Sequence, residues 1–179
     1  MPLAPEYFTA DMVRALPEDG QRYEVVHGEL FVTPAPAKEH QRIVRRLVVA
    51  LDSYCRRYGI GETFDSPADV SWDRDILVQP DVFVVVPDEA AAPGWAAVRT
   101  LLLVAEVLSP STARRDRFPK RRLYQENQVG VVWLVDPTRR VVEIWLPTST
   151  EAAIESRRLI WHPDGAAAPL VLDVHELFT

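Results

Sequence analysis

The amino-acid sequence predicts an α/β (α+β) fold, in which helices flank a central mixed β-sheet. Residues 38–58 carry apolar side chains at three- and four-residue steps, which is typical of an amphipathic helix. Several shorter runs are rich in Val, Ile, Leu and aromatic residues and are separated by Pro, Gly or Asp, which is typical of strands and turns. The segments follow one another as helix, hairpin, long helix, several strands, helix and strands. This order indicates a mixed sheet with helices on its faces.

The chain is long enough to form one domain with a substantial core. It has 179 residues, of which 47% are hydrophobic and 26% are charged, as is ordinary for a globular protein. No internal repeat is visible, so we expect residues 1–179 to form a single domain. The net charge of −6 argues against a protein that binds nucleic acid through charge alone, although an acidic chain can still present a basic face.

Three features of the sequence favour the cytoplasm. Cys55 is the only cysteine, which excludes an intrachain disulfide and a cysteine zinc site. No apolar run approaches the roughly 20 residues of a membrane span. The N-terminus lacks the basic and apolar regions of a signal peptide. We therefore expect a cytoplasmic protein that makes no use of a membrane.

The N-terminal part of the chain predicts a short helix followed by a hairpin. Residues 9–16 read as a helix that Thr9 caps. Residues 22–33 read as two strands joined by His27-Gly28, since glycine in the second position suits a two-residue hairpin turn. We assign residues 1–20 to an N-terminal helical segment that precedes the main sheet.

The helix of residues 38–58 is the clearest element of the sequence. Its apolar stripe begins at Ile43, and Gly59 ends the helix. His40 falls in phase with this stripe, one turn before Val44. We therefore expect the His40 side chain to face inward at the first turn of the helix.

The remaining elements are predicted from apolar runs and the breaks between them. Residues 101–108 form the most apolar run, which we expect to be a central strand buried on both faces. Proline is poorly tolerated inside a helix, so the next helix is expected to begin near Pro119 and to run to about Asn127. The other expected elements are strands at 62–66, 68–72, 76–86, 130–135, 140–146 and 152–161, with a last strand and a terminal helical turn at 171–178. Within residues 76–86, Pro80 marks an edge, a bulge or a bend.

Two of the strand-like runs each carry one carboxylate. Asp81 precedes the apolar residues 82–86, and Glu106 lies within residues 101–108. A buried carboxylate is costly unless it is paired or binds a metal ion. Two such groups at the ends of neighbouring strands suit Mg²⁺ or Mn²⁺, which prefer oxygen ligands. The alternative is a pair of carboxylates that arginine or backbone N–H groups neutralise.

The order of these motifs resembles the PD-(D/E)XK nuclease superfamily and, more closely, the restriction-endonuclease-like family known as Uma-two. The resemblance covers roughly residues 20–146, with the C-terminal strands and terminal helical turn at 147–179 outside it. Pro80-Asp81 alone is weak evidence, but the whole series in this order is specific to the family. The matching segments are residues 23–30, 34–36 with His40, 80–82, 106–112 followed by Asp116, Lys120 and Tyr124, and 130–137.

The resemblance implies a central mixed sheet flanked by helices and a site for Mg²⁺ or Mn²⁺. By this resemblance Asp81 and Glu106 are metal ligands, with the backbone carbonyl of Val107 as a third. The superfamily pattern places a lysine two residues after the glutamate, where this chain has Leu108. Lys120 on the following helix is the candidate replacement, and the alternative is that Lys120 is one more solvated base.

Other polar residues are weaker candidates for the same site. His40 can approach the metal ion or a phosphate, or can simply complete a hydrogen bond in the core. Glu29 can belong to the site or be an ordinary exposed strand residue. Asp116 can pair with Lys120 four residues later or cap the helix. Tyr124 is expected to pack rather than to react.

Basic residues on the two main helical segments are candidates for contacts to a nucleic-acid backbone, which would be tolerant of sequence and sensitive to salt. Their alternative is an ordinary solvated surface. These residues are Arg45, Arg46, Arg114, Arg115, Arg121 and Arg122.

Three functional hypotheses follow from the sequence. The first is a Mg²⁺-dependent endonuclease in which a metal-activated water hydrolyses DNA, and a homodimer is expected because cutting both strands needs two sites. The second is a catalytically inactive protein that uses a nuclease scaffold for binding or assembly, which Leu108 and the acidic composition favour. The third is a phosphoesterase that acts on a small substrate.

Overall fold

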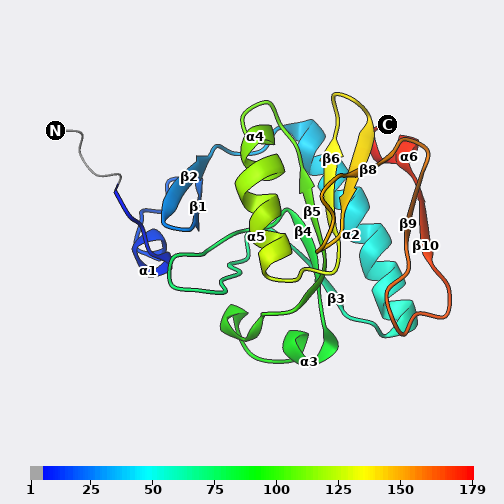
Figure 1. The fold of residues 1–179 in the computed structure, drawn as a ribbon, viewed down its shortest axis with the longest axis horizontal. Helices are drawn as coiled ribbons and strands as arrows, with labels where there is room; N and C mark the ends of the chain where they lie inside the picture. Colours follow the sequence, from blue (N-terminus) through cyan, green and yellow to red (C-terminus); the bar gives the residue numbers. More distant parts are fainter. Residues whose placement is uncertain (1–5) are drawn as a thin grey trace.

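The computed structural model describes residues 6–179, and its centre is a six-stranded sheet in the order β3-β4-β5-β6-β7-β8 (Figure 1). β5 and β6 run parallel, and every other neighbouring pair runs antiparallel. The predicted α/β (α+β) fold with a mixed sheet is therefore confirmed. The six strands are β3 (Glu62–Asp65), β4 (Val82–Val85), β5 (Leu101–Val107), β6 (Val132–Asp136), β7 (Val141–Trp145) and β8 (Ala153–Glu155).

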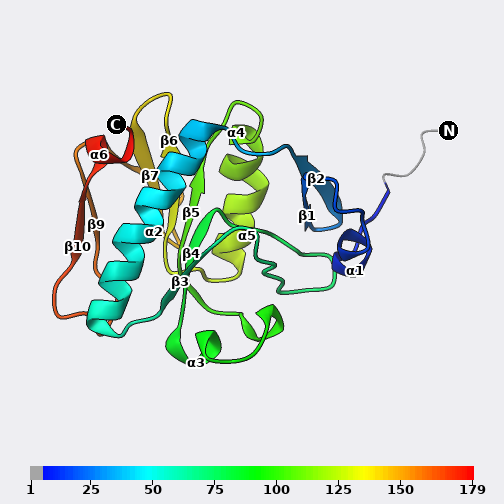
Figure 2. The ribbon, with the colours of Figure 1, turned by 180° about the vertical axis from the view of Figure 1, so that it is seen from behind.

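One face of the sheet is covered by α2 (Lys38–Tyr58), which crosses it as predicted (Figure 2). The helix ends at Gly59, whose backbone adopts the left-handed conformation that glycine tolerates best. Its buried stripe, including Leu47 and Leu51, packs in one cluster with Leu103 and Val107 of β5. This apolar contact fixes the first turn of α2 relative to the end of β5.

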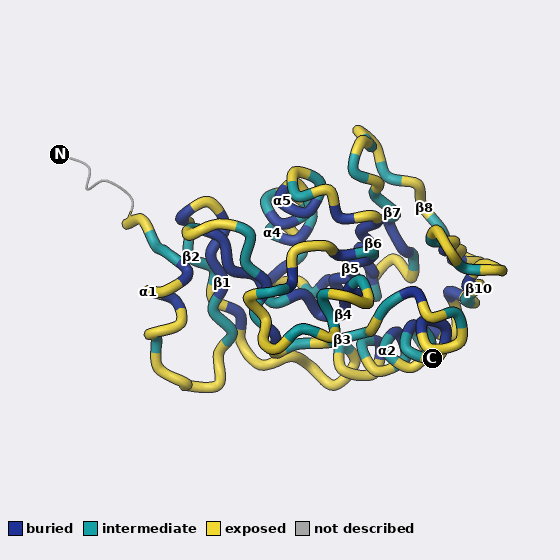
Figure 3. The backbone as a smooth tube through the Cα atoms, turned by 90° about the horizontal axis from the view of Figure 1, so that it is seen from below, coloured by how far each residue is buried: buried dark blue, intermediate teal, exposed yellow. Residues whose placement is uncertain are grey.

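The opposite face is covered by a continuous helical run, α4 (Ala113–Arg115), η2 (Asp116–Lys120) and α5 (Arg121–Glu126). Figure 3 shows the three layers, with the sheet between α2 and this run. Successive side chains of a strand point to opposite faces. Val104 and Leu108 therefore pack with Leu123 and Tyr124 of α5, whereas Ala105 and Val107 lie in the cluster with α2.

The helical run begins earlier than the sequence predicts. Helical structure starts at Ala113, and Pro119 lies inside η2, a π-helical turn, rather than at the start of a helix. Proline removes an N–H donor and clashes with the carbonyl four residues before it, so it disfavours a regular α-helix. The wider π turn accommodates this residue, and such turns are frequent at functional sites.

The strand predicted at residues 76–86 is also interrupted. Pro80 has no N–H for the strand ladder, and β4 begins only after it. The earlier part pairs elsewhere, because Leu77 exchanges two backbone hydrogen bonds with Val25. The strand predicted at residues 68–72 is reduced to an isolated bridge between Val70 and Val78.

Two small hairpins lie on either side of the main sheet (Figure 1). The first consists of β1 (Arg22–Val26) and β2 (Glu29–Thr33), which pair as predicted and lie next to α1 (Ala10–Arg14). The second consists of β9 (Arg158–Trp161) and β10 (Leu170–Asp173) and leads into the predicted terminal turn, α6 (Val174–Leu177). The connection from β4 to β5 holds α3 (Pro87–Ala90) and the short helix η1 (Trp95–Ala97).

Thr9 caps α1 as predicted, since its hydroxyl accepts a hydrogen bond from the backbone N–H of Met12 at 3.3 Å. In the part of the chain that the structure describes, no helix combines the length and apolarity needed to cross a membrane.

The packing of α2 makes a direct prediction for stability. Leu47 is fully buried, whereas Val49 on the same helix is 65% exposed. We expect Leu47→Ala to lower the free energy of unfolding by about 2–5 kcal/mol, since it removes transfer free energy and leaves a cavity. We expect Val49→Ala, the matched control, to change it by no more than about 0.5 kcal/mol. Urea unfolding followed by tryptophan fluorescence measures both, and equal losses would contradict the placement of α2.

Candidate active site

The strand register brings Asp81 and Glu106 together at one end of the sheet. β4 and β5 are antiparallel, with Val82 opposite Ala105, so Asp81 at the start of β4 lies beside Glu106 near the end of β5. The backbone N–H of Val107 donates to Asp81 Oδ2 at 2.9 Å, and the N–H of Asp81 makes a weak contact with Glu106 Oε2 at 3.4 Å. Both carboxylates are almost completely buried. Two residues 25 positions apart in the chain thus share one site.

Lys120 is the cation of this site. It is the last residue of η2, its side chain is fully buried, and its Nζ lies 2.7 Å from Glu106 Oε1. Leu108, at the position where the superfamily pattern has lysine, is instead buried in the apolar cluster beneath α5. The helical run therefore brings Lys120, rather than residue 108, to Glu106. Its second strong partner is Glu24 rather than Asp81.

Glu24 is a member of the site that the sequence analysis did not single out. It lies in β1, is fully buried, and its Oε1 accepts from Lys120 Nζ at 2.8 Å and from the backbone N–H of Gln79 at 2.8 Å. Its second oxygen, Oε2, is buried without a hydrogen-bond partner within residues 6–179. The signal that drew attention to Asp81 was also present here, because Glu24 is a carboxylate followed directly by the apolar strand residues Val25 and Val26.

Two basic side chains hold Asp81 from the other side. His40 Nε2 lies 3.0 Å from Asp81 Oδ2, so the inward-facing orientation expected for His40 is found. Arg22, the first residue of β1, donates from Nη1 to Asp81 Oδ1 at 2.8 Å. Asp81 therefore has both oxygens engaged, one by His40 and Val107 and the other by Arg22.

Asp116, Arg115 and Tyr124 complete the cluster from the helical run. Asp116 Oδ1 lies 3.9 Å from Lys120 Nζ, which agrees with the expected pairing one turn apart. Tyr124 packs in the core, but its hydroxyl also donates to Glu106 Oε1 at 2.5 Å, a polar role that the sequence did not suggest. Arg115 lies with Nη2 3.8 Å from Glu24 Oε2.

The charges of the cluster shift one another's protonation. Burial lowers the pKa of Lys120, but the carboxylates of Glu106, Glu24 and Asp116 outweigh burial and raise it above its ordinary value. Burial is the main cause that raises the pKa of Glu106, to about 7. The charge of Lys120 lowers this pKa, and the charges of Asp81 and the other carboxylates raise it. Lys120 therefore keeps its charge, and a further cation beside Glu106 would favour the ionised form of that carboxyl.

Asp81 is affected in the opposite direction. Burial would raise its pKa, but the hydrogen bond from His40 and the charge of Arg22 hold the pKa well below its usual range. Lys120 and Arg22 likewise outweigh burial at Glu24 and lower the pKa of that carboxyl. Asp81 and Glu24 are therefore ionised at neutral pH.

The donor set suits a hard divalent cation. Asp81, Glu106 and Glu24 offer carboxylate oxygens, of which Glu24 Oε2 is unpaired and Glu106 Oε2 accepts only the weak contact from Asp81. Among the described residues, no three His, Cys, Asp or Glu side chains already converge as metal ligands. Lys120 lies between Glu24 and Glu106 and pairs with both, and Arg22 pairs with Asp81. The residues thus fit Mg²⁺ or Mn²⁺ in chemistry, although a basic side chain would have to move.

Other predicted residues lie outside the cluster. Glu29 is exposed on β2, opposite Val26. Arg46 donates to the backbone carbonyl of Leu177 at 3.0 Å and thereby anchors α6. Arg121 lies over the ring of Trp145, 4.1 Å from its centroid.

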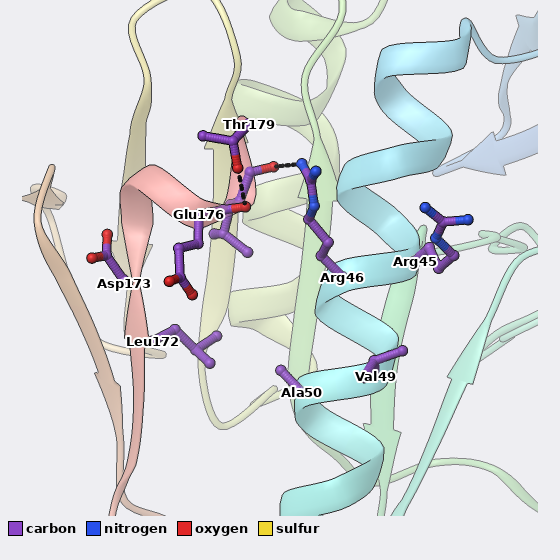
Figure 4. A pocket seen from close by; sticks show the side chains of 9 residues that line it. Arg45, Arg46, Val49, Ala50, Leu172, Asp173, Glu176 and Thr179 are labelled. Atoms are coloured by element: carbon purple, nitrogen blue, oxygen red, sulfur yellow. Dashed lines mark hydrogen bonds between the residues drawn. The ribbon is translucent and has the colours of Figure 1, made fainter.

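A surface pocket of about 490 Å³ lies between α2 and α6, away from the buried cluster (Figure 4). Its lining includes Arg45 and Arg46, but also Asp173 and Glu176, whose carboxylates repel phosphate. Arg46 is turned toward the end of the chain, as its bond to Leu177 requires. Of the six arginines proposed to contact nucleic acid, those with exposed side chains are Arg45, Arg114 and Arg122.

A mixed sheet flanked by helices, with one acid just before a central strand and another near the end of its neighbour, resembles the restriction-endonuclease-like fold, although the lysine here comes from the following helix rather than from the strand. The chain belongs to the Uma2 family, described as "Putative restriction endonuclease", whose family model matches residues 10–175. This match extends beyond both ends of the 20–146 segment on which the sequence resemblance rests.

A solved structure supports the same fold. The chain is similar to a protein from Anabaena variabilis ATCC 29413 described as a putative nuclease belonging to DUF820, with 23% sequence identity and a TM-score of 0.79. The similarity covers 96% of this chain and 97% of that one. The comparison with curated proteins found no match.

The position of Lys120 predicts a large effect of its removal. Lys120→Met leaves Glu24 and Glu106 buried and facing each other without their cation. We expect a loss of about 3–5 kcal/mol in the free energy of unfolding, the usual effect of breaking a buried ion pair. Arg122→Met, at an exposed position two residues later, serves as the control and should cause a far smaller loss. Chemical denaturation followed by circular dichroism measures both, and similar losses would show that Lys120 does not neutralise the cluster.

Proposed function

We propose that this protein is a metal-dependent nuclease that hydrolyses phosphodiester bonds in DNA, with Mg²⁺ or Mn²⁺ as cofactor. The observation that carries the proposal is the meeting of Asp81, Glu106 and the buried Lys120 at the end of the two central strands. The family to which the chain belongs adds to this, since its description is that of a restriction endonuclease. Lys120 takes the part of the lysine that the motif lacks at Leu108.

Each residue has a role that follows from its contacts. Asp81 and Glu106, with the carbonyl of Val107, would hold the metal ion, which supplies a water of lowered pKa and polarises a phosphoryl oxygen. Lys120 keeps a positive charge at Glu106, where it can stabilise the extra negative charge of a phosphoryl transition state. Tyr124 donates to the same oxygen of Glu106 and so fixes the carboxylate orientation.

Glu24 and His40 extend this proposed site. Glu24 shares Lys120 with Glu106, so it positions the ammonium group from the side of β1. His40 fixes the second oxygen of Asp81 and leaves Oδ1 as the oxygen that faces Arg22. Glu29 is exposed, and the contacts favour Glu24 over it as the acid that this hairpin contributes.

The partner in this proposal is DNA, and the exposed Arg45, Arg114 and Arg122 are its candidate phosphate contacts. A homodimer follows as an expectation from the need to cut two strands. Charge on these arginines would make binding weaken steeply with salt.

A catalytically inactive protein on a nuclease scaffold is the second candidate. The observation in its favour is the complete burial of Lys120 and Glu24, together with Arg22 on Asp81. In that case the cluster would serve only to join β1, β4, β5 and the helical run, and binding or assembly would be the function.

Substitution of the carboxylates distinguishes the two candidates. We expect Asp81→Asn and Glu106→Gln each to reduce Mg²⁺- or Mn²⁺-dependent nicking of supercoiled plasmid by more than the roughly 10–100-fold that loss of a supporting residue costs. Lys120→Arg keeps the charge but changes the geometry and should reduce nicking to a lesser degree. Asp88→Asn, on exposed α3, is the matched control and should nick like the wild type. Wild-type protein that is folded yet does not nick plasmid with either metal would favour the inactive scaffold.

A further inference from the structure

Arg22 occupies the oxygen of Asp81 that a metal ion would need. Its Nη1 donates to Asp81 Oδ1 at 2.8 Å, and the other oxygen of Asp81 is already engaged by Val107 and His40. A Mg²⁺ ion binds a carboxylate oxygen at about 2.0–2.1 Å, and at that distance its charge repels a guanidinium group on the same oxygen. Arg22 and a metal ion therefore compete for the same lone pairs of Asp81.

The contacts of the Arg22 side chain with Asp81 and its neighbours are of a kind that can be broken. All its hydrogen bonds to described residues run through the single nitrogen Nη1, with Asp81, with the carbonyl of Gln79 at 3.2 Å and with Ser66 Oγ at 3.2 Å. The side chain is 19% exposed, whereas Lys120 is fully enclosed. Arg22 is also the first residue of β1, so its side chain lies at an end of the hairpin rather than within it.

The charge balance of the cluster explains why such a cation is present. The cluster contains four buried carboxyl groups, Glu24, Asp81, Glu106 and Asp116. It contains three permanent cations, Arg22, Arg115 and Lys120, besides the imidazole of His40. A divalent ion added to this nearly neutral set would bring an excess of positive charge into a buried site, which is unfavourable unless a cation leaves or an anion enters.

We propose that Arg22 is a resident counter-ion of Asp81 that leaves the carboxylate when a divalent cation binds, so that the free site binds metal weakly. The proposal rests on the proposed function, because it assumes a metal site at Asp81 and Glu106. Exchange of one arginine charge for a divalent ion adds one positive charge, which equals the single negative charge of one phosphodiester. Metal and nucleic-acid phosphate are thus expected to bind together rather than separately.

Mn²⁺ binding to the protein without nucleic acid tests the exchange. The free Mn²⁺ signal in electron paramagnetic resonance gives the affinity of wild type, Arg22→Met and Arg22→Gln. Arg22→Gln is included because its amide can still donate to Asp81 if the methionine variant unfolds. We expect the Kd for Mn²⁺ to be lower in both variants than in the wild type by about tenfold or more, since a nearby positive charge is removed. Arg14→Met, which removes an exposed arginine from a surface pair with Asp11, should bind Mn²⁺ like the wild type.

Asp81→Asn in the Arg22→Met background separates the inference from the function on which it rests. Loss of tight Mn²⁺ binding in the double variant supports both. Equal Mn²⁺ affinity in wild type and the Arg22 variants, with binding lost in Asp81→Asn, overturns the role of Arg22 and leaves the metal site standing. Absence of Mn²⁺ binding in all proteins, or binding that Asp81→Asn does not change, overturns both.

A measurement on the wild type alone avoids any dependence on how the variants fold. Phenylglyoxal modifies accessible guanidinium groups, and mass spectrometry reports the rate at each arginine. We expect Mn²⁺ at concentrations that bind to accelerate modification of Arg22 several-fold and to leave that of the exposed Arg122 unchanged. An Arg22 rate that is the same with and without Mn²⁺ overturns the proposal.

Discussion

The structure depends on the neutralisation of buried carboxylates by Lys120. An isolated charge inside a protein costs several kcal/mol, and an ion pair there is tolerated only with good geometry and further hydrogen bonds. Lys120 meets this condition with two carboxylates at 2.7 and 2.8 Å, Glu106 of β5 and Glu24 of β1. The hairpin is outside the main sheet, so this shared ammonium group is one of the bonds that hold it against the core. The pairing of Lys120 with both carboxylates therefore determines where the site lies and also attaches the hairpin to the core.

The conformation of the helical run places the ammonium group of Lys120 beside Glu106. Glu106 points to the face of the sheet opposite α2, because side chains alternate along β5. The π-helical turn η2 ends at Lys120, and α5 then continues with Tyr124 one turn later, facing the same carboxylate. Pro119 within the turn is incompatible with a regular α-helix and so favours the wider turn. The sequence feature that misled the helix prediction is therefore part of how the site is formed.

Periodicity and local chemistry predicted the fold class, the long helix and the hairpin, because these depend on residues close in the chain. The order of motifs led to Asp81, Glu106 and Lys120, and the geometry brings those three into one cluster. Glu24 carried the same local signal as Asp81, a carboxylate in an apolar strand, but its pairing with Lys120, 96 positions away, could not be read from any local pattern. Arg22 was missed for the same reason. An irregularity at Pro80 was predicted from its missing N–H, but the new partner of the preceding segment could not be predicted.

The distribution of unpaired polar atoms argues that this cluster is more than a structural ion network. Buried polar side-chain atoms in folded proteins nearly always have a partner, and those that do not tend to mark functional positions. Within residues 6–179 five buried side-chain atoms have none, and three of them belong to this cluster: Glu24 Oε2, His40 Nδ1 and Arg115 Nε. Selection for stability alone would favour apolar residues or complete pairing at these positions. An unpaired acceptor on Glu24, an unpaired donor on Arg115 and a free imidazole nitrogen on His40 are instead what a site needs if it is to take up both a cation and an anion.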